Sequence, residues 1–416
     1  MKLYKHQIDA LNLTQDFNRC AYYLDMGLGK TFVGSEKAMS FYQDILVICQ
    51  KSKINDWLGH FKEYYECDTV NVYDLSDSKD FERYNSRSRD IAGWSVAIIN
   101  YDLVWRRKIN IKDFTLMLDE SSLIQNRKSK RTKAVLKLKA DNVVLLSGTP
   151  TDGKYERLWT QCKLLGWDIS ESDFWDKYVK WRNIKFGTIT VKQVYGYKHI
   201  RELKNELKNH GCVFMKTDEV IYLPEQVDQI IKCDVTSDYK KFVKNDFLEI
   251  DGTELIGDNS LTKILYRRQL CSQYNPNKLA SFLDIVDSTS DRLIVFYNFT
   301  AELDLLKSHI NKPVSIVNGE IKDLENYENC DDSVTFVQYQ AGAYGLNLQK
   351  ARRIVYFSLP LSSEQFEQSK KRTHRIGQKN TCFYYMMICK KSIEEDIYKS
   401  LLEKKDYTDR LFNKNL

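Results

Sequence analysis

A glycine-containing run that ends in lysine and threonine is the first part of this sequence able to do chemistry. Residues 24–31 read LDMGLGKT, at the end of an apolar run and the start of a helix-like stretch. Glycines allow a loop backbone to curl so that its N–H groups converge on phosphate oxygens at a helix N-terminus. Lys30 would reach the terminal phosphates of a nucleotide, and the Thr31 hydroxyl would complete a Mg²⁺ shell. The loop itself would consist of Asp25, Met26, Gly27, Leu28 and Gly29.

This loop departs from the usual GxxxxGK(S/T) pattern at one position. Leu24 stands where the first glycine belongs, and Gly27 supplies flexibility inside the loop. An ordinary glycine-rich turn between a strand and a helix is the alternative interpretation. The position of the GKT triplet at a helix start, directly after a buried strand, favours a phosphate site.

A pair of carboxylates follows another apolar run, in the segment LMLDESS. Asp119 and Glu120 would lie at the carboxyl end of a strand, the edge where ligands bind in open α/β sheets. Asp119 would hold Mg²⁺, and Glu120 would polarise an attacking water. An acidic pair that ends a strand is more often a solvated turn. Its combination with the Lys30 loop favours a site for metal-assisted phosphoryl transfer.

Two regions of alternating strand-like and helix-like segments could position these groups. Nearly continuous apolar runs predict parallel strands buried on both faces at 20–25, 44–50, 94–100, 114–120, 142–147, 292–298, 314–317, 334–338, 353–357 and 382–389. We therefore predict an α/β protein with two lobes, each a mostly parallel sheet flanked by helices. The expected division is a first lobe at 1–165, a helical insertion at 166–275 and a second lobe at 276–416.

Composition excludes several classes of protein. The chain has 416 residues, of which 43% are hydrophobic and 29% are charged, so a disordered, collagen-like or disulfide-stapled chain is not expected. No stretch approaches the ~20 apolar residues that span a bilayer, and MKLYKHQIDA does not resemble a signal peptide. The ten cysteines lack zinc-ligand spacing and are expected to be buried thiols in a reducing compartment. The net charge of +6 permits a nucleic-acid partner but is weak evidence for one.

Further segments occur in an order that resembles a known family. LLSGTP, VFYNFTAEL, QAGAYGLNLQKA and QSKKRTHRIGQ follow the acidic pair. This set resembles the motor of superfamily-two helicases and, within it, the SWI/SNF-type DNA translocases. DESSLIQNRKSKRTKA is similar to the acidic box of that family, although Ser121 and Ser122 replace the usual Ala-His. The resemblance implies two RecA-like lobes with ATP and Mg²⁺ between them and DNA across both.

The resemblance also implies roles for single residues. Arg372 and Arg375 match the arginine fingers that neutralise the γ-phosphate, and Gln368 lies one turn earlier; a solvated basic helix face is the alternative. Three residues apart, the two arginines would share one face of a helix. Gln7 matches a glutamine that reads adenine through two hydrogen bonds, although a lone glutamine near a terminus is normally just exposed.

Two loops match the segments that connect nucleotide state with DNA contact. Ser147, Gly148 and Thr149 match the first of them, and a helix N-cap is the simpler explanation of the same residues. Gly342, Gly345 and Asn347 match a second-lobe loop that faces ATP and the DNA backbone.

Basic segments supply candidate DNA contacts. Residues 126–139 contain seven basic side chains and could neutralise phosphates without reading bases. The candidates are Arg127, Lys128, Lys130 and Arg131, with Lys51 and Lys53 in QKSKIN. A second patch at 105–108 (WRRK) is a further candidate, and a solubilising charge run is the alternative for all of them. Aromatic residues at 174, 175, 178 and 181 favour a small hydrophobic core over a base-stacking platform.

The expected function is a DNA-stimulated ATPase that moves along duplex DNA, bound through the phosphate backbone without sequence specificity. The alternatives are a strand-separating helicase and a nucleic-acid-binding module with an inactive ATP site. No targeting module is recognisable, so a protein partner could supply targeting. Few prolines and many Lys, Asn and Tyr residues suggest an AT-rich genome. We therefore expect a minimal bacterial or bacteriophage form in the cytoplasm of a bacterium or infected cell.

Overall fold

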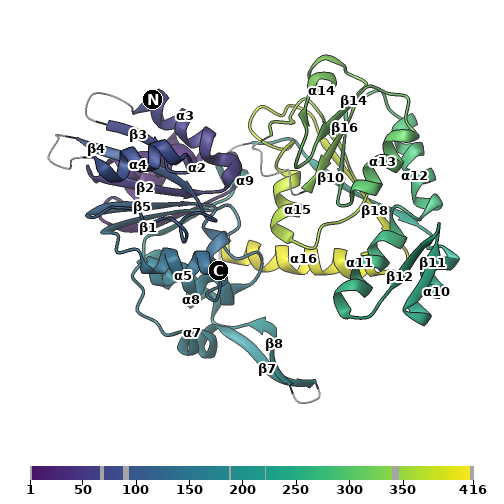
Figure 1. Cartoon of the computed structure of the whole chain (residues 1–416), viewed down its shortest axis with the longest axis horizontal. Helices are drawn as coiled ribbons and strands as arrows, with labels where there is room; N and C mark the ends of the chain where they lie inside the picture. The colour runs from purple at the N-terminus through teal and green to yellow at the C-terminus, as the bar shows by residue number, and fades with distance from the viewer. Residues whose placement is uncertain are drawn as a thin grey trace. The chain divides into compact units, whose positions relative to one another are not determined.

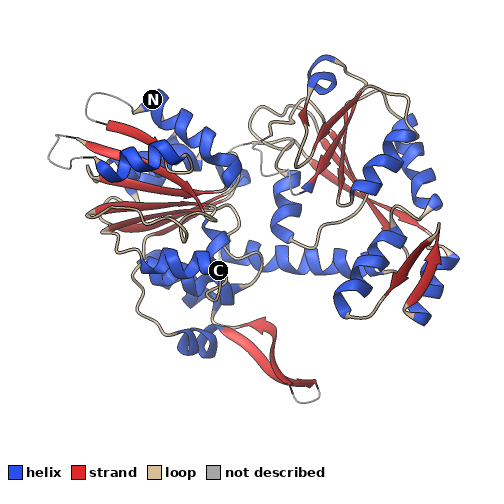
Figure 2. Cartoon of the chain, in the orientation of Figure 1, coloured by secondary structure: helices blue, strands red, loops and turns tan. Residues whose placement is uncertain are grey.

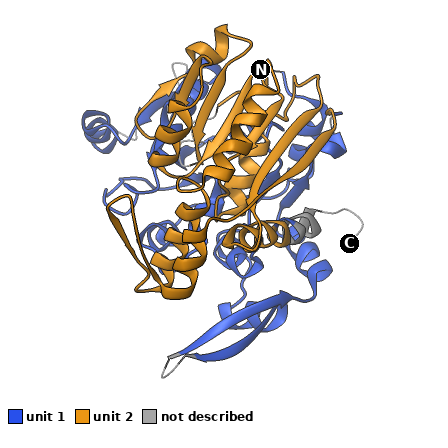
Figure 3. Cartoon of the chain, turned by 90° about the vertical axis from the view of Figure 1, so that its right-hand side faces the viewer, with its two compact units in different colours: residues 1–222, 405–416 blue, residues 223–404 orange. Residues whose placement is uncertain are grey.

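Apolar runs in the sequence form the central strands of two seven-stranded sheets. The computed structural model describes residues 2–65, 70–87, 93–186, 189–220, 222–339 and 346–412. The chain divides into a first unit of residues 1–222 and 405–416 and a second unit of residues 223–404 (Figure 3). Each unit is an α/β layer structure with helices beside a mainly parallel sheet (Figure 2). The predicted pair of RecA-like lobes is confirmed at this level.

The first sheet brings the ends of its strands to one edge. Its order is β3-β4-β2-β5-β6-β1-β9, and every neighbouring pair is parallel (Figure 1). The strands are β1 Arg19–Leu24, β2 Asp44–Cys49, β3 Val70–Asp74, β4 Trp94–Asn100, β5 Phe114–Asp119, β6 Asn142–Leu146 and β9 Cys212–Met215. All the loops that follow these strands therefore emerge at the carboxyl edge of the sheet.

Helices cover both faces of this sheet because alternate strand residues point to opposite sides. In β2, Leu46 and Ile48 pack in one hydrophobic cluster, whereas Ile45 and Val47 pack in the other. The helices are α1 Lys5–Asn12, α2 Lys30–Met39, α3 Ile54–Tyr64, α4 Ser78–Ser86, α5 Lys130–Lys137, α6 Trp159–Leu164, α7 Glu171–Tyr178, α8 Ile200–Asn209 and α9 Thr217–Val220. Short 3₁₀ turns span Lys51–Lys53, Ser121–Ile124 and Tyr155–Leu158.

The second sheet has the same plan with one antiparallel edge. Its order is β10-β18-β17-β13-β16-β14-β15, and only β15 runs antiparallel to its neighbour among the described strands. The strands are β10 Gln226–Cys233, β13 Leu293–Tyr297, β14 Val314–Val317, β15 Lys322–Asp323, β16 Val334–Gln338, β17 Arg353–Tyr356 and β18 Cys382–Cys389. The helices are α10 Ser237–Asn245, α11 Ser260–Cys271, α12 Pro276–Asp287, α13 Thr300–Ser308, α14 Glu325–Asn329, α15 Ser363–Lys370 and α16 Ile393–Phe412, and a hairpin joins β11 Phe247–Ile250 to β12 Thr253–Ile256.

All ten predicted strands are present, with ends that agree to within one residue. The region 166–275 differs from the helical insertion that we expected. It contains a hairpin of β7 Val179–Phe186 and β8 Ile189–Tyr197, it adds β9 to the first sheet and β10 to the second, and the units divide inside it at 222. Strand β9 has only four residues, and most of the residues of β10 are exposed at the edge of their sheet. The exposed strand β10 therefore lacks the apolar run by which a central strand is recognised, and β9 stands apart from the regular alternation of strands and helices.

Two other expectations concern burial. The nine described cysteines are free thiols, and all but Cys330 are buried, as predicted. Of the four aromatic residues expected to form a small core, Phe174 and Tyr178 belong to the hydrophobic core, whereas Trp175 and Trp181 are half-buried and lie against Lys192. Within the described chain, no helix is long and apolar enough to cross a membrane.

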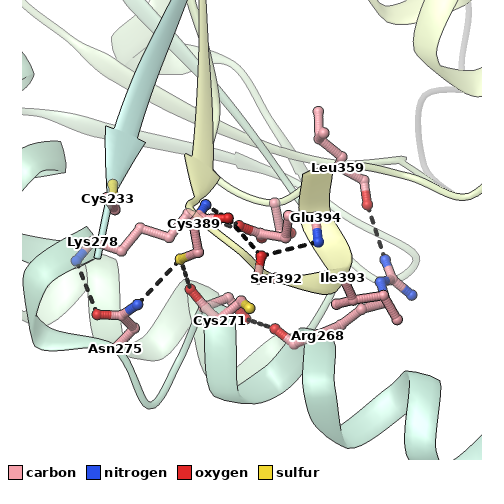
Figure 4. Close-up of polar contacts among 12 residues, drawn as sticks. Cys233, Arg268, Cys271, Asn275, Lys278, Leu359, Cys389, Ser392, Ile393 and Glu394 are labelled. Atoms are coloured by element: carbon pink, nitrogen blue, oxygen red, sulfur yellow. Dashed lines mark hydrogen bonds and ion pairs between the residues drawn. The ribbon is translucent and has the colours of Figure 1, made fainter. Parts of the chain in front are cut away.

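A buried ion pair connects three elements of the second unit. Lys278 of α12 and Glu394 of α16 are 0% and 3% exposed, and Nζ lies 2.6 Å from Oε1. The other carboxylate oxygen accepts a hydrogen bond from the backbone N–H of Cys389 at 2.9 Å, at the end of β18 (Figure 4). Burial opposes the charge on Lys278, but Glu394 outweighs burial, and the pKa of Lys278 is raised.

We expect Lys278→Met to destabilise the second unit by about 3–5 kcal/mol, because Glu394 would remain buried without a counter-charge. Urea unfolding followed by circular dichroism measures the change. Lys399→Met, at an exposed position on the same helix, is the matched control and should unfold as the unchanged protein does. Equal unfolding midpoints for the two variants would contradict the interpretation.

Candidate functional site

The predicted phosphate loop curls between β1 and α2. Gly27 and Gly29 have φ angles of 88° and 75°, a left-handed conformation that favours glycine. A Cβ atom on Gly29 would lie 2.1 Å from Nε2 of Gln7, so a larger residue would also clash. Lys30 begins α2, and its Nζ donates to the carbonyl of Leu24 at 3.1 Å. The Lys30 ammonium group thus lies against the main chain at the start of the loop, with Thr31 in the first turn of the helix.

Gln7 lies against this loop and is only 3% exposed. Its Nε2 donates to the carbonyl of Leu28 at 3.2 Å, and its Oε1 accepts from the backbone N–H of Tyr4 at 2.8 Å. Gln7 is therefore not the exposed residue that a position near the terminus usually implies. Both ends of its amide are bonded to the main chain, so reading adenine would require these bonds to rearrange.

The predicted acidic pair ends β5 beside the same edge of the sheet. Oδ2 of Asp119 accepts a hydrogen bond of 2.9 Å from the indole N–H of Trp57 in α3. Burial raises the pKa of Asp119, against the Trp57 hydrogen bond and the positive charges of Lys30 and Lys53, which lower it. The structure thus brings the charges of Lys30 and Asp119 within interaction range.

Glu120 adopts a backbone conformation that is uncommon for a residue with a side chain. Its φ of 52° places it in the left-handed region, which costs of order 1–3 kcal/mol for a residue other than glycine. The phenol of Tyr101 donates to the carbonyl of Asp119 at 2.9 Å and holds the main chain on one side. Such strain at the end of a strand is typical of functional sites.

The loop after β6 lies between the phosphate loop and the acidic pair. Since β6 separates β5 from β1 in the sheet, its loop can reach both neighbours. A Cβ atom on Gly148 would lie 3.2 Å from Nζ of Lys30, and Oγ of Ser147 lies 3.5 Å from Oε2 of Glu120. Oγ of Ser147 also accepts from the backbone N–H of Thr149 at 3.1 Å. The next helical turn begins only at Tyr155, so these residues do not cap a helix.

The two predicted arginines lie in the second unit, beyond the helix on which we expected them. Helix α15 ends at Lys370, and Arg372 and Arg375 occupy the turns that follow, so the prediction of a shared helix face is wrong. Gln368 is on α15, where its Nε2 donates to Glu364 at 3.2 Å. Arg372 is 7% exposed, and burial lowers the pKa of Arg375.

Neighbouring residues of the same motif fix this arginine segment. Nε2 of Gln378 lies 3.0–3.3 Å from the carbonyls of Gln349, Ala351 and Thr373. Nε2 of His374 lies 2.6 Å from the carbonyl of Pro224 and must donate to it. The segment is therefore bonded to main chain on both sides.

Comparison with known proteins assigns the chain to a family. A model of the SNF2-related domain matches residues 12–276, which is more than half of the chain. The chain belongs to the SNF2-related family. A model of the helicase conserved C-terminal domain matches residues 277–377, and together the two models make this chain a SWI/SNF-type ATPase of helicase superfamily two.

Individual relatives of this SNF2-related chain are distant. The SWI/SNF-related matrix-associated actin-dependent regulator of chromatin subfamily A member 1 of Mus musculus is 24% identical over 90% of the chain and 39% of its own length. An uncharacterised ATP-dependent helicase of Mycoplasma genitalium is 24% identical over 90% of the chain and 38% of its own length. The chain thus spans about two fifths of these relatives. The solved SWI2/SNF2 ATPase core of Sulfolobus solfataricus in complex with dsDNA has 19% identity and a TM-score of 0.44, and the match covers 98% of this chain and 92% of that one.

The polar residues that brace the SNF2-related site were mostly not predicted. Gln161 of α6 accepts from Ser121 at 2.7 Å and Tyr23 at 3.0 Å and donates to the carbonyl of Pro150 at 2.8 Å. Thr217 of α9 donates to Asp25 from both its N–H (3.3 Å) and its hydroxyl (3.1 Å). Trp57 and Tyr101 complete the set. Their contacts join residues far apart in the sequence, so the sequence alone does not reveal them. Ser121 was the exception, because it departs from the family pattern.

The predicted DNA-contacting residues all lie in the first unit, and some of them already contact other side chains. Lys53 pairs with Asp56 at 2.7 Å, Arg127 pairs with Glu171 at 2.5 Å, and Nζ of Lys130 lies 4.6 Å from the ring of Trp105. Lys51 and Lys128 are exposed, and Arg131 is half-buried. In the second patch, Arg107 donates to the carbonyls of residues 75–77 and so has a structural role.

The remaining predicted residues belong to the second-unit loop after β16. Gly342 and Gly345 lie outside the described residues, and Asn347 is exposed.

We expect Trp57→Phe to shift the acid limb of the pH–rate profile for ATP hydrolysis. Loss of the indole hydrogen bond raises the pKa of Asp119 further, so the carboxylate protonates and activity falls at a higher pH than in the unchanged protein. The shift should be readily measurable, because a hydrogen bond to a charged group contributes about 1.5–3 kcal/mol.

Trp159→Phe is the matched control, because its indole N–H donates to the carbonyl of Ile169 instead. Initial rates across the acidic range measure the shift. An unmoved acid limb in Trp57→Phe, or an equal shift in Trp159→Phe, would contradict this role of Trp57.

Proposed function

We propose that this SWI/SNF-type ATPase is stimulated by duplex DNA and uses ATP hydrolysis to move along it. The observation that carries the proposal is the convergence of Lys30, Gly148 and Glu120, with Asp119 beside them, at the carboxyl edge of one parallel sheet. The SNF2-related and helicase C-terminal matches support the same activity.

Each residue of the first unit has a distinct task in this proposal. The N–H groups of the loop and the Lys30 ammonium group bind the ATP phosphates, and Glu120 orients the attacking water. The Thr31 hydroxyl and the half-buried carboxylate of Asp119 offer the hard oxygen ligands that Mg²⁺ requires. Mg²⁺ would neutralise charge on the β- and γ-phosphate oxygens. Arg372 and Arg375 of the second unit would neutralise the charge that develops during transfer.

A chain of hydrogen bonds can connect this chemistry to DNA contact. The loop that starts at Ser147 continues to Pro150, whose carbonyl accepts from Gln161 at 2.8 Å and from Gln125 at 3.4 Å. Gln125 directly precedes the basic segment 126–139 and also accepts from Arg157 at 2.9 Å. A shift of the loop on phosphate release would therefore pull on the segment proposed to bind DNA.

The proposed partner is duplex DNA held through its phosphates. Arg127, Lys128, Lys130 and Arg131, with Lys51 and Lys53, supply positive charge that would neutralise phosphates, so binding would be largely independent of sequence. The curated relatives are more than twice as long as the matched segment. A separate targeting protein is a further part of the proposal.

We expect duplex DNA to raise the rate of ATP turnover, and Lys30→Ala and Glu120→Gln each to lower it about 100-fold or more, since phosphate binding or water activation is lost. Lys79→Ala and Glu82→Gln, at exposed positions on α4, are the matched controls. A rate of ATP turnover that is the same with and without DNA, or that is unchanged by either site substitution, would contradict the proposal.

Two assays separate the alternatives. A strand-separating helicase would release a labelled strand from a forked duplex, whereas a duplex translocase would displace a triplex-forming strand without opening the duplex. A binding module with an inactive site would retain DNA affinity and hydrolyse no ATP.

A further inference from the structure

We propose that the β7–β8 hairpin of the first unit is a DNA-binding arm that enters the major groove of the duplex. This inference rests on the proposed function and adds to it a contact outside the basic segment 126–139. The hairpin projects from the first unit in both views (Figures 1 and 3).

The hairpin carries charge of one sign. Residues 179–198 contain five basic residues and no acidic one, although 57 of the 416 residues of the chain are acidic. Four of the basic side chains are exposed on the two strands: Lys180, Arg182, Lys185 and Lys192. Within the described chain, none of these four forms an ion pair with a carboxylate, unlike Arg127 at the base of the hairpin. Their charge is therefore available to a polyanion.

The charge is distributed over both faces of the ribbon. Trp181 pairs with Val194 and Asn183 pairs with Lys192, so these residues share one face, which also holds Lys185. Arg182 and Lys180 lie on the opposite face. A ribbon lying flat on a DNA backbone would need basic residues on one face only. Basic residues on both faces fit a groove that has a phosphate backbone along each wall.

The size of the ribbon selects the groove. Two paired strands lie about 4.8 Å apart within the plane of the ribbon. The side chains extend from its two faces and add to its thickness perpendicular to that plane. The major groove is about 12 Å wide and admits a two-stranded ribbon, whereas the minor groove is about 6 Å wide.

The fold anchors the hairpin at its base and leaves the strands exposed. Tyr197 stacks on Tyr155 with ring centroids 4.4 Å apart, and its hydroxyl donates to Glu156 at 2.7 Å. Beyond this base, β7 and β8 pair only with each other, and Val191 and Tyr195 are 46% and 61% exposed. A two-stranded hairpin alone is marginally stable in water, so a partner that neutralises its charge would also stabilise it.

The arm is continuous with the proposed DNA-binding segment. A cavity of about 490 Å³ at its base is lined by Arg127, Lys128, Trp175 and Lys192, among others that include Glu156 and Glu171. Nζ of Lys192 lies 3.9 Å from the ring of Trp181 and 5.4 Å from that of Trp175. Arg182 donates to Gln193 at 3.0 Å. These contacts hold the side chains in place, and we expect them to contact phosphates without sequence preference.

The test is the triple variant Lys180→Gln/Arg182→Gln/Lys185→Gln, which keeps Lys192 and its contact with Trp181. Binding to a fluorescent duplex is measured over a range of salt concentrations. Each phosphate contact contributes about 0.9 to the slope of log K against log[salt], so the slope should fall by about 2–3 and affinity by about tenfold or more. Lys62→Gln/Lys79→Gln/Lys240→Gln, at exposed positions elsewhere, is the charge-matched control.

Groove-specific ligands decide between the grooves. Methyl green, which occupies the major groove, should abolish the difference between the unchanged protein and the hairpin variant, and netropsin, which occupies the minor groove, should preserve it. An unchanged salt slope in the hairpin variant, an equal loss in the control, or a difference abolished by netropsin alone would overturn the proposal. If duplex DNA stimulates ATP turnover of the unchanged protein while the hairpin variant binds normally, the arm fails and the proposed function stands. If duplex DNA does not change the ATP turnover of the unchanged protein, the proposed function itself is contradicted.

Discussion

In the proposed ATPase, the first unit depends on keeping the half-buried carboxylate of Asp119 charged. Burial favours the neutral form of Asp119, which would be a poor ligand for Mg²⁺. The indole N–H of Trp57 and the positive charges of Lys30 and Lys53 act against burial. Lys30 can do so because the sheet order β5-β6-β1 sets the phosphate loop one strand away from the acidic pair. The same order inserts Gly148 beside the Lys30 ammonium group, where a side chain would crowd it.

Polar side chains connect the loops of this edge to one another. Gln161 bonds to β1, to the acidic box and to the loop after β6 through Tyr23, Ser121 and Pro150. Because Ser121 is fully buried, its hydroxyl requires a partner, and Gln161 supplies one. The serine at 121, where the family usually has alanine, thus has a local structural reason. A network with its buried groups satisfied is rigid, so displacement of one loop is transmitted to the others.

Sequence reasoning succeeded where one physical signal dominates. Central strands such as β2 and β13 are apolar on both faces, and their ends were predicted to within one residue. The phosphate loop and the acidic pair follow such strands and were located with them. Strand β9 was missed because it stands apart from the regular alternation of strands and helices, and Thr217 was missed because its contact with Asp25 joins segments 192 residues apart. Such contacts depend on the order of strands in the sheet, which local patterns do not encode.

In the RTHRIGQ segment, the residues around Arg372 and Arg375 form hydrogen bonds that fix the main chain. In RTHRIGQ, the Gln378 amide lies against three carbonyls, and His374 lies against Pro224. Gly377 has a φ of 101°, and a Cβ atom there would lie 2.8 Å from Oε1 of Gln349. The arginines lie past the end of α15, where backbone hydrogen bonds from Arg372 to Ser369 and from His374 to Lys370 continue the turn, and the side-chain bonds hold it further. A guanidinium can stabilise a transferring phosphoryl group only if its position is set before the reaction begins, since reorganisation would otherwise oppose the gain. The spacing of the motif thus reflects the bonds that fix the main chain around Arg372 and Arg375 more than a helical periodicity.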